Sequence, residues 1–169
     1  LTALAAAAVS LPGSPERLSD WRWLARPPEG RRITLTGKDR LEAYAGKFLL
    51  LEVIGPGVMD HLILRDPELA LAITVDDKPL WQGKAGTLAG NAPLFPAPAG
   101  FGGASFLHLQ APVGFATSLR ILVDKPDPWR YVSFRAFRDA GEVFPAAGEA
   151  YAQGLLAAAK AWNPSMPDQ

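Results

Sequence analysis

Acidic residues are the groups in this sequence best suited to chemistry, because a glycosidase needs only two carboxyl groups across the scissile bond, one protonated and one ionised. Asp60 and Glu52 stand within apolar runs, where burial would perturb the pKa of a carboxyl group. For each candidate, an exposed or hydrogen-bonded structural role is the alternative, and the sequence alone pairs none of them. The candidates are Asp39, Glu42, Glu52, Asp60, Asp66, Glu68, Asp76, Asp77, Glu142 and Glu149.

The chain offers little for metal or nucleophilic chemistry. It has no cysteine and two histidines, His61 and His108, so neither a thiolate site nor a multi-histidine metal site is expected, and no cofactor is implied. His61 follows Asp60, but neighbouring side chains of a regular strand point to opposite faces, so these two would not pair. We expect both histidines to be hydrogen-bonded structural residues.

Aromatic side chains are candidates for sugar binding, since carbohydrate-binding modules stack pyranose rings on Trp and Tyr. Trp81, Trp129 and Tyr131 stand near predicted strand ends or turns, where such platforms occur. Aromatic residues of strands also belong to cores, which is the alternative for these three. Trp21 and Trp23 lie in a Pro-rich stretch, which favours a linker that docks on the domain over a sugar platform.

Composition and missing motifs narrow the function further. Lys plus Arg and Asp plus Glu are 17 each, so the formal net charge is zero and nucleic acid is not an expected partner. The sequence contains no Walker-type phosphate loop, no Gly-x-Ser-x-Gly elbow and no His-Glu-x-x-His helix. The usual motifs therefore assign no enzyme class.

The elements that would position these residues are predicted to be short strands. With 169 residues, 16 Gly and 16 Pro, the chain suits one domain with many turns. Between residues 83 and 103 it predicts a long surface loop. Apolar or alternating runs predict strands over residues 31–36, 47–54, 58–64, 69–75, 105–110, 119–124 and 129–137. Turns are predicted at 55–57 and at 76–79, the second of which joins the strand 69–75 to Leu80 and Trp81 in a hairpin.

A helix is predicted near the C-terminal end, over residues 147–162, because Tyr151, Leu155, Ala158 and Trp162 form one helical stripe. The expected fold is therefore all-β, a jelly-roll β-sandwich with one short C-terminal helix. We expect the sandwich over residues 31–145, and the helix and tail over residues 146–169.

Residues 1–30 are expected to be a signal-peptide remnant followed by a linker. Residues 1–9 are apolar and Ala-rich but too short to span a bilayer. This pattern predicts a secreted or periplasmic protein, with no membrane span. A frayed Ala-rich helix start is the alternative.

Four segments share a pattern: GPGVMDHLIL (55–64), LALAITVDDKPLWQG (69–83), PVGFATSLRI (112–121) and WRYVSFRAF (129–137). The first resembles Gly-Pro-Gly-Val-Ile-x-His-Ile-Trp of glycoside hydrolase family 172, formerly a domain of unknown function numbered 2961. The others are similar to the family's strand and hairpin, its Pro-Met-Pro-Phe-x-x-Ser-x-Arg-Ile and its Tyr-Tyr-Tyr-Ile-Asp-Tyr-Arg-Thr-Phe. Matching positions are Gly55, Pro56, Gly57, Val58, His61, Pro112, Phe115, Ser118, Arg120, Ile121, Tyr131, Arg135 and Phe137.

The resemblance implies a protein of two consecutive jelly rolls, often oligomeric, that acts on fructose- or arabinose-containing glycans. It also implies two catalytic glutamates, in Gly-Glu-Gly-Asp and Gly-Thr-Gly-Thr-Glu-Asp-Tyr segments. This sequence contains neither segment, and Glu142 and Glu149 lack the flanking residues. The family's Gly-Gly-Asn-x-Asp-Trp motif corresponds to residues 36–41, where Asn and Trp are replaced; Asp39, one position before that of the family's Asp, is the sugar contact that the resemblance implies.

We therefore expect an exported protein that resembles the first jelly roll of such an enzyme and is not catalytic alone. No catalytic residue is assigned, and Asp39, Trp81 and Trp129 are the predicted substrate-binding residues. The expected partners are carbohydrate and either a second jelly roll or further copies of this chain. A stand-alone carbohydrate-binding or assembly module is the alternative, and an enzyme with a new carboxylate pair is the third hypothesis.

Overall fold

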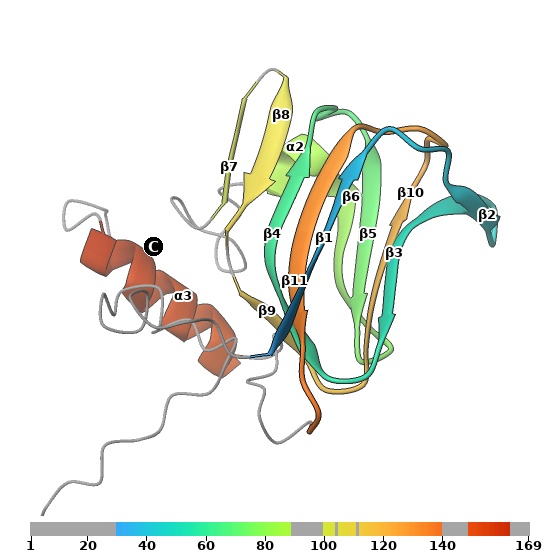
Figure 1. Cartoon of the computed structure of the whole chain (residues 1–169). Helices are drawn as coiled ribbons and strands as arrows, with labels where there is room; N and C mark the ends of the chain where they lie inside the picture. Colours follow the sequence, from blue (N-terminus) through green and yellow to red (C-terminus); the bar gives the residue numbers. More distant parts are fainter. Residues whose placement is uncertain (1–29, 89–99, 104, 111, 140–148, 163–169) are drawn as a thin grey trace, which may run out of the picture.

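The computed structural model describes residues 30–88, 100–103, 105–110, 112–139 and 149–162. These residues form two antiparallel β-sheets packed against each other, with two helices beside them (Figure 1). The predicted β-sandwich is therefore confirmed. Residues 1–29, with the predicted signal-peptide remnant, Trp21 and Trp23, lie outside the described residues, as does Glu142.

The first sheet has the strand order β1-β11-β4-β8-β7, and β9 pairs with β4 in addition; the second has the order β2-β3-β10-β5-β6. The first sheet comprises β1 (Arg31–Gly37), β4 (Gly57–Leu64), β7 (Gly100–Gly103), β8 (Phe106–Leu109), β9 (Val113–Phe115) and β11 (Arg130–Ala136). The second sheet comprises β2 (Glu42–Tyr44), β3 (Lys47–Ile54), β5 (Ala70–Val75), β6 (Lys78–Lys84) and β10 (Ser118–Val123). The helices are α2 (Ala85–Leu88) and α3 (Glu149–Trp162).

The core lies between the two sheets and follows from alternation along the strands. Every second residue of a strand points to the same face, so one face of each sheet can be wholly apolar. The inward residues are almost completely buried, which makes apolar burial the main stabilising contribution. They are Leu71, Ile73 and Val75 of β5, Leu119, Ile121 and Val123 of β10, and Leu62, Leu64, Leu107, Leu109 and Val132 of the first sheet.

The predicted Gly-Pro-Gly turn carries the chain from β3 in the second sheet to β4 in the first. Gly55 has a φ of 104°, a backbone conformation that favours glycine. Gly57 is required for a different reason: a Cβ there would lie 2.4 Å from the ring of Phe115 and 2.6 Å from the carbonyl oxygen of Arg135. Only a residue without a side chain allows this close packing.

The predicted hairpin at Asp76 and Asp77 is confirmed, but its turn is tighter than predicted, because Lys78 and Pro79 already belong to β6. Both residues have positive φ angles, 50° and 60°, and Val75 pairs with Lys78 directly across the turn. Two central residues with positive φ are typical of the type I′ turn, which matches the twist of the flanking strands.

The prediction of a surface loop between residues 83 and 103 is wrong at both ends of that segment. Gly83 and Lys84 complete β6, residues 85–88 form α2, and residues 100–103 form β7; residues 89–99 lie outside the described part. Ala85 and Leu88 are fully buried, so α2 is part of the core and not a surface loop. A four-residue helix is too short to leave a periodic signal in the sequence.

The predicted helical stripe is confirmed for three of its residues. Tyr151, Leu155 and Ala158 of α3 are buried, and the side chain of Trp162 lies outside the described part. The Tyr151 hydroxyl donates a hydrogen bond to the carbonyl oxygen of Pro112, 3.2 Å away, which holds α3 beside β9 (Figure 1). Burial raises the pKa of Tyr151. Neither described helix has the length and apolar character needed to cross a membrane.

Candidate functional site

Two of the three predicted sugar contacts, Asp39 and Trp129, lie at the same end of the first sheet. Asp39 follows β1, Trp129 precedes β11, and these two strands are hydrogen-bonded neighbours. Arg130 joins them, because its Nη1 atom donates to the backbone oxygen of Asp39 at 3.1 Å. The Asp39 carboxylate is exposed and lies close to Gly37, at 3.3 Å from the position a Cβ would take there.

The indole of Trp129 already has a cationic neighbour. The Arg65 guanidinium carbon lies 4.6 Å from the centre of the ring, a distance typical of a cation–π contact. The backbone also joins these residues, since Arg65 N–H donates to the Trp129 carbonyl at 3.4 Å. A sugar ring that stacks here must use the opposite face of the indole or displace Arg65.

Trp81 lies elsewhere. It belongs to β6, at the edge of the second sheet, where it pairs with Ile73 and packs against the hydrophobic core. A Cβ on Gly83 would lie 3.1 Å from its ring, so the indole lies over that glycine. Within the described residues its buried Nε1 has no hydrogen-bond partner. These contacts are those of the core role, which was the alternative for this residue.

A second group of polar residues lies on the outer face of the first sheet; we call Asp60, His61, His108 and Arg135 the outer-face cluster. Arg135 is 1% exposed, and the side chain of Asp60 is 14% exposed. The Arg135 guanidinium donates to both carboxylate oxygens of Asp60, with a shortest N–O distance of 2.6 Å. The pair is a bidentate ion pair, which is the strong form of this contact.

A β-bulge places Asp60 on this face. Ser133 of β11 pairs with His61, but the next residue, Phe134, pairs with Met59, so Asp60 is the extra residue of β4. The expectation that Asp60 and His61 point to opposite faces assumed a regular strand and is wrong for that reason. Bulges re-aim a side chain, and here the bulge directs Asp60 to Arg135.

His61 and His108, for which the sequence predicted no contact with each other, lie side by side on the outer face of the first sheet. His108 of β8 pairs with Ile63, two residues along from His61, and the two imidazole rings lie 5.9 Å apart. Burial lowers the pKa of His61; Asp60 opposes this shift and Arg32 adds to it. Burial also lowers the pKa of His108, and the neighbouring His61 adds to that shift. Both rings are therefore neutral at pH 7.

Two further candidate carboxylates, those of Glu52 and Asp76, are held by structural partners. Glu52 forms an ion pair with Arg120 across β3 and β10, with an N–O distance of 2.7 Å. Asp76 accepts the backbone N–H groups of Ala116, Thr117 and Ser118 at 3.0, 2.6 and 3.0 Å. The Thr117 hydroxyl also donates to Asp76.

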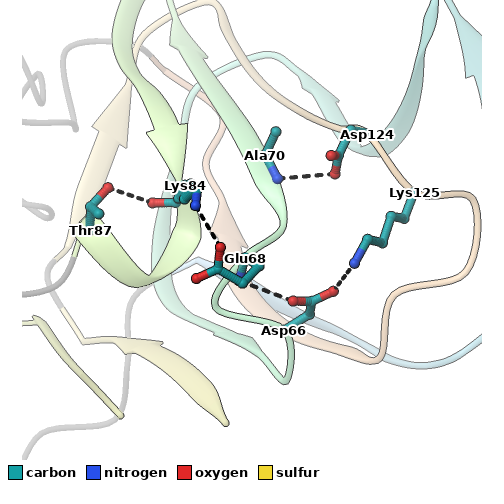
Figure 2. A network of polar contacts seen from close by, with 7 residues as sticks. All are labelled: Asp66, Glu68, Ala70, Lys84, Thr87, Asp124 and Lys125. Atoms are coloured by element: carbon teal, nitrogen blue, oxygen red, sulfur yellow. Dashed lines mark hydrogen bonds and ion pairs between the residues drawn. The ribbon is translucent and has the colours of Figure 1, made fainter. Parts of the chain in front are cut away.

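Figure 2 shows a third arrangement, the strand-end network of Asp66, Glu68, Lys84, Asp124 and Lys125. Lys84 contacts Glu68 at 2.6 Å, Lys125 donates to Asp66, and Asp124 accepts the N–H of Ala70 at 3.0 Å. The hydrogen bond from Lys125 is the main reason why the pKa of Asp66 is lowered. The network ties the loop between β4 and β5 to the end of β6 and to the segment after β10.

The carboxylates that the structure brings to partners are thus satisfied by cations or backbone N–H groups, and none of these contacts joins two acids across an open site. Among the described residues there is no group of three or more metal-ligating side chains. Two features were not predicted from the sequence: the ion pair of Arg135 with Asp60, and the hydrogen bonds from residues 116–118 to the Asp76 carboxylate. Arg135 stands in an apolar strand, a signal that a buried acidic partner is needed.

In comparisons with known proteins, no protein-family model and no curated protein matches this chain.

Proposed function

We propose that this chain is a non-catalytic jelly-roll domain of an exported, glycan-acting protein related to glycoside hydrolase family 172. The strand pairing carries the proposal. When β2 and β7, which end the two sheet orders, and β9, which lies off the main path, are set aside, eight strands remain: β1, β3, β4, β5, β6, β8, β10 and β11.

A jelly roll is a long hairpin rolled into two sheets, so its first strand pairs with its eighth, the second with the seventh, the third with the sixth and the fourth with the fifth. The corresponding pairs here are β1 with β11, β3 with β10, β4 with β8 and β5 with β6. All four are antiparallel. This agreement supports the jelly-roll assignment beyond that of a generic sandwich.

The positions of the four resembling segments give further support. The first forms the turn into β4, the second forms the β5–β6 hairpin, the third runs through β9 into β10, and the fourth is β11. Arg135 and Phe115, two of the matching residues, are fully or nearly fully buried. A resemblance that falls on core-forming and turn-forming positions is the kind expected from a shared scaffold.

The absence of catalysis is proposed from the contacts of the acids. Asp60, Asp76 and Glu52 each accept hydrogen bonds from positively charged or backbone donors. A general acid must be protonated near neutral pH, whereas hydrogen bonds from residues 116–118 lower the pKa of Asp76. The carboxylates of Asp60 and Glu52 are occupied by ion pairs with Arg135 and Arg120. Neither glutamate segment that the resemblance implies is present in this sequence.

The alternative, a stand-alone carbohydrate-binding or assembly module, is favoured by one observation. Asp39 and Trp129 lie at one end of the sheet, joined by Arg130, and so offer a carboxylate and an aromatic ring to the same ligand. In this alternative the sugar contacts are Asp39 and Trp129, without Trp81.

The test is to incubate the purified chain with fructan and arabinan and to measure reducing-sugar release. We expect no release above a blank. Release that survives repurification and is lost in Glu52→Gln or Asp60→Asn would overturn the proposal. A tryptophan-fluorescence titration with fructo- and arabino-oligosaccharides then separates the alternative: a binding module gives a saturable change that Trp129→Phe removes and Trp81→Phe retains.

A further inference from the structure

Four strands end the two described sheet orders, β1 and β7 in the first sheet and β2 and β6 in the second, and they differ in how they avoid pairing with other chains. β2 has three residues, and β7 has four residues of the sequence GFGG. β6 contains Pro79, carries Lys78 and Lys84 at its ends, and is bulged opposite Ile73 and Thr74. Short length, proline, lysine and bulges are the known devices that prevent edge-to-edge association.

β1 has neither short length nor a proline, a lysine or a bulge, and its two charged residues, Arg31 and Arg32, stand together at its first end. It is a regular strand of seven residues, RRITLTG, that pairs with β11 without a register shift. No described strand lies on its other side. Arg31, Arg32, Thr34, Leu35 and Thr36 are all exposed, and Leu35 is one of the few large apolar side chains on the surface, at 38% exposure. Its outer edge therefore presents backbone donors and acceptors to a partner strand.

We propose that β1 is a dimerisation edge, which pairs with β1 of a second copy of this chain in antiparallel orientation. A two-fold axis at Thr34 places Thr34 opposite the partner's Thr34, Ile33 opposite the partner's Leu35, and Arg32 opposite the partner's Thr36. This register uses all seven residues. It also covers the exposed Leu35 with an apolar side chain, because directly opposed residues point to the same face.

Charge complementarity selects the same register. Arg31 comes opposite the partner's Gly37, and the Asp39 carboxylate lies beside Gly37 in each copy. The dimer therefore has an Arg31–Asp39 contact at each end. A register centred on Arg32 would place two guanidinium groups opposite each other, which is unfavourable.

The first test uses a chain that has no cysteine, so a single introduced thiol reports one position. Thr34→Cys lies on the axis, where opposed Cα atoms are about 4.5–5.5 Å apart, within the range of a disulfide. Thr36→Cys is the matched control, because residue 36 is an exposed residue on the same face of the same strand. In the proposed register, residue 36 of one copy lies ~14 Å from residue 36 of the other copy. Gln82→Cys, exposed on β6, is the control for random collision.

Under mild oxidation we expect Thr34→Cys to form a covalent dimer at least about tenfold faster than either control. Equal rates for Thr34→Cys and Thr36→Cys would overturn the proposal.

The second test measures association of the full chain by sedimentation equilibrium. We expect the mass to rise from 18.1 kDa toward twice that value with a dissociation constant in the micromolar range, because a seven-residue edge is smaller than a standard interface. Asp39→Arg should raise this constant about tenfold, and the combination with Arg31→Asp should restore it. A chain that stays at 18.1 kDa up to millimolar concentration contradicts the proposal.

Discussion

The outer-face cluster and the strand-end network each contain an ion pair with an N–O distance of 2.6 Å, but the surroundings of the two pairs are very different. Arg135 and Asp60 approach to 2.6 Å with side chains 1% and 14% exposed. Lys84 and Glu68 also approach to 2.6 Å, but their side chains are 60% and 69% exposed. Distance therefore does not distinguish these pairs, and burial does.

The difference teaches which acids the fold depends on. A guanidinium buried beneath the sheet surface has lost its water, so removal of its bidentate carboxylate costs an ion pair that solvent does not replace. An exposed ammonium regains water when its partner is removed, and salt screens the pair in any case. The following predictions test this contrast, from the largest expected effect to the smallest.

Asp60→Asn is expected to lower the free energy of unfolding by about 3 kcal/mol, because it removes the negative charge that accepts from both Nε and Nη2 of the buried Arg135 guanidinium. Urea denaturation followed by tryptophan fluorescence measures the loss. The double variant Asp60→Asn with Arg135→Met should recover part of it, since the buried charge is then gone. A single-variant loss below about 1 kcal/mol would remove the distinction between the two regions.

Asp76→Asn is expected to cost about 1–2 kcal/mol, because an amide cannot accept from all the donors of residues 116–118, and the site is only partly buried. Asp77→Asn is the matched control, in the same turn and with the same sign of φ. It should leave stability within about 0.5 kcal/mol of the parent chain. Equal effects of the two substitutions would show that the turn, and not the carboxylate, is what matters.

Stability should fall as the pH is lowered through 6.5, the ordinary pKa of histidine. The pKa values of His61 and His108 are lowered in the folded chain, so between the folded and the ordinary values the unfolded state binds more protons. Stability from this source is complete above pH 6.5 and is lost as the pH falls through the folded values. Urea midpoints between pH 7.5 and 5 measure the slope, and His61→Gln should flatten it. An unchanged slope in that variant would assign the effect to other groups.

A second loss of stability, due to carboxylates, should begin in more acidic solution. Burial alone would raise the pKa of Asp76, but the N–H groups of Ala116, Thr117 and Ser118 and the Thr117 hydroxyl outweigh it and lower that pKa. The pKa of Asp66 is lowered as well, by Lys125. Their contribution is present above the ordinary carboxyl pKa of 3.8 and disappears as the pH falls through the lower folded values. Asp76→Asn should reduce the loss of stability in this acidic range and leave the loss caused by the two histidines unchanged.

The smallest effect is expected from Lys84→Met, which removes the exposed pair with Glu68. The urea midpoint should shift less than in any variant above, and the shift should shrink further in high salt because exposed charges are screened. A loss comparable to that of Asp60→Asn would mean that exposure does not weaken these pairs.

Much of the scaffold was predictable because its strands carry strong patterns. Ile33 and Leu35, the apolar run 47–54 and the acidic hairpin at Asp76 each indicate a strand or turn from neighbouring residues alone. The helical stripe of Tyr151, Leu155 and Ala158 is equally local. β2, β9 and α2, with three, three and four residues, are too short to produce such a signal.

The contacts of the site were not predictable, because they join residues far apart in the chain. Asp60 and Arg135 are 75 positions apart, and their pairing depends on β4 and β11 being neighbours and on a bulge that no local pattern indicates. Asp76 finds its donors only because the turn before β10 reaches the β5–β6 hairpin. The sequence identifies the acidic residues, but their contacts depend on which strands are neighbours in the fold.

The central claim is that these acids hold the sandwich together and that burial sets how much each one contributes. One urea series on Asp60→Asn, Asp76→Asn and Asp66→Asn tests it most directly. The account predicts that the loss of unfolding free energy decreases in that order. Equal losses, or a largest loss for Asp66→Asn, would contradict it.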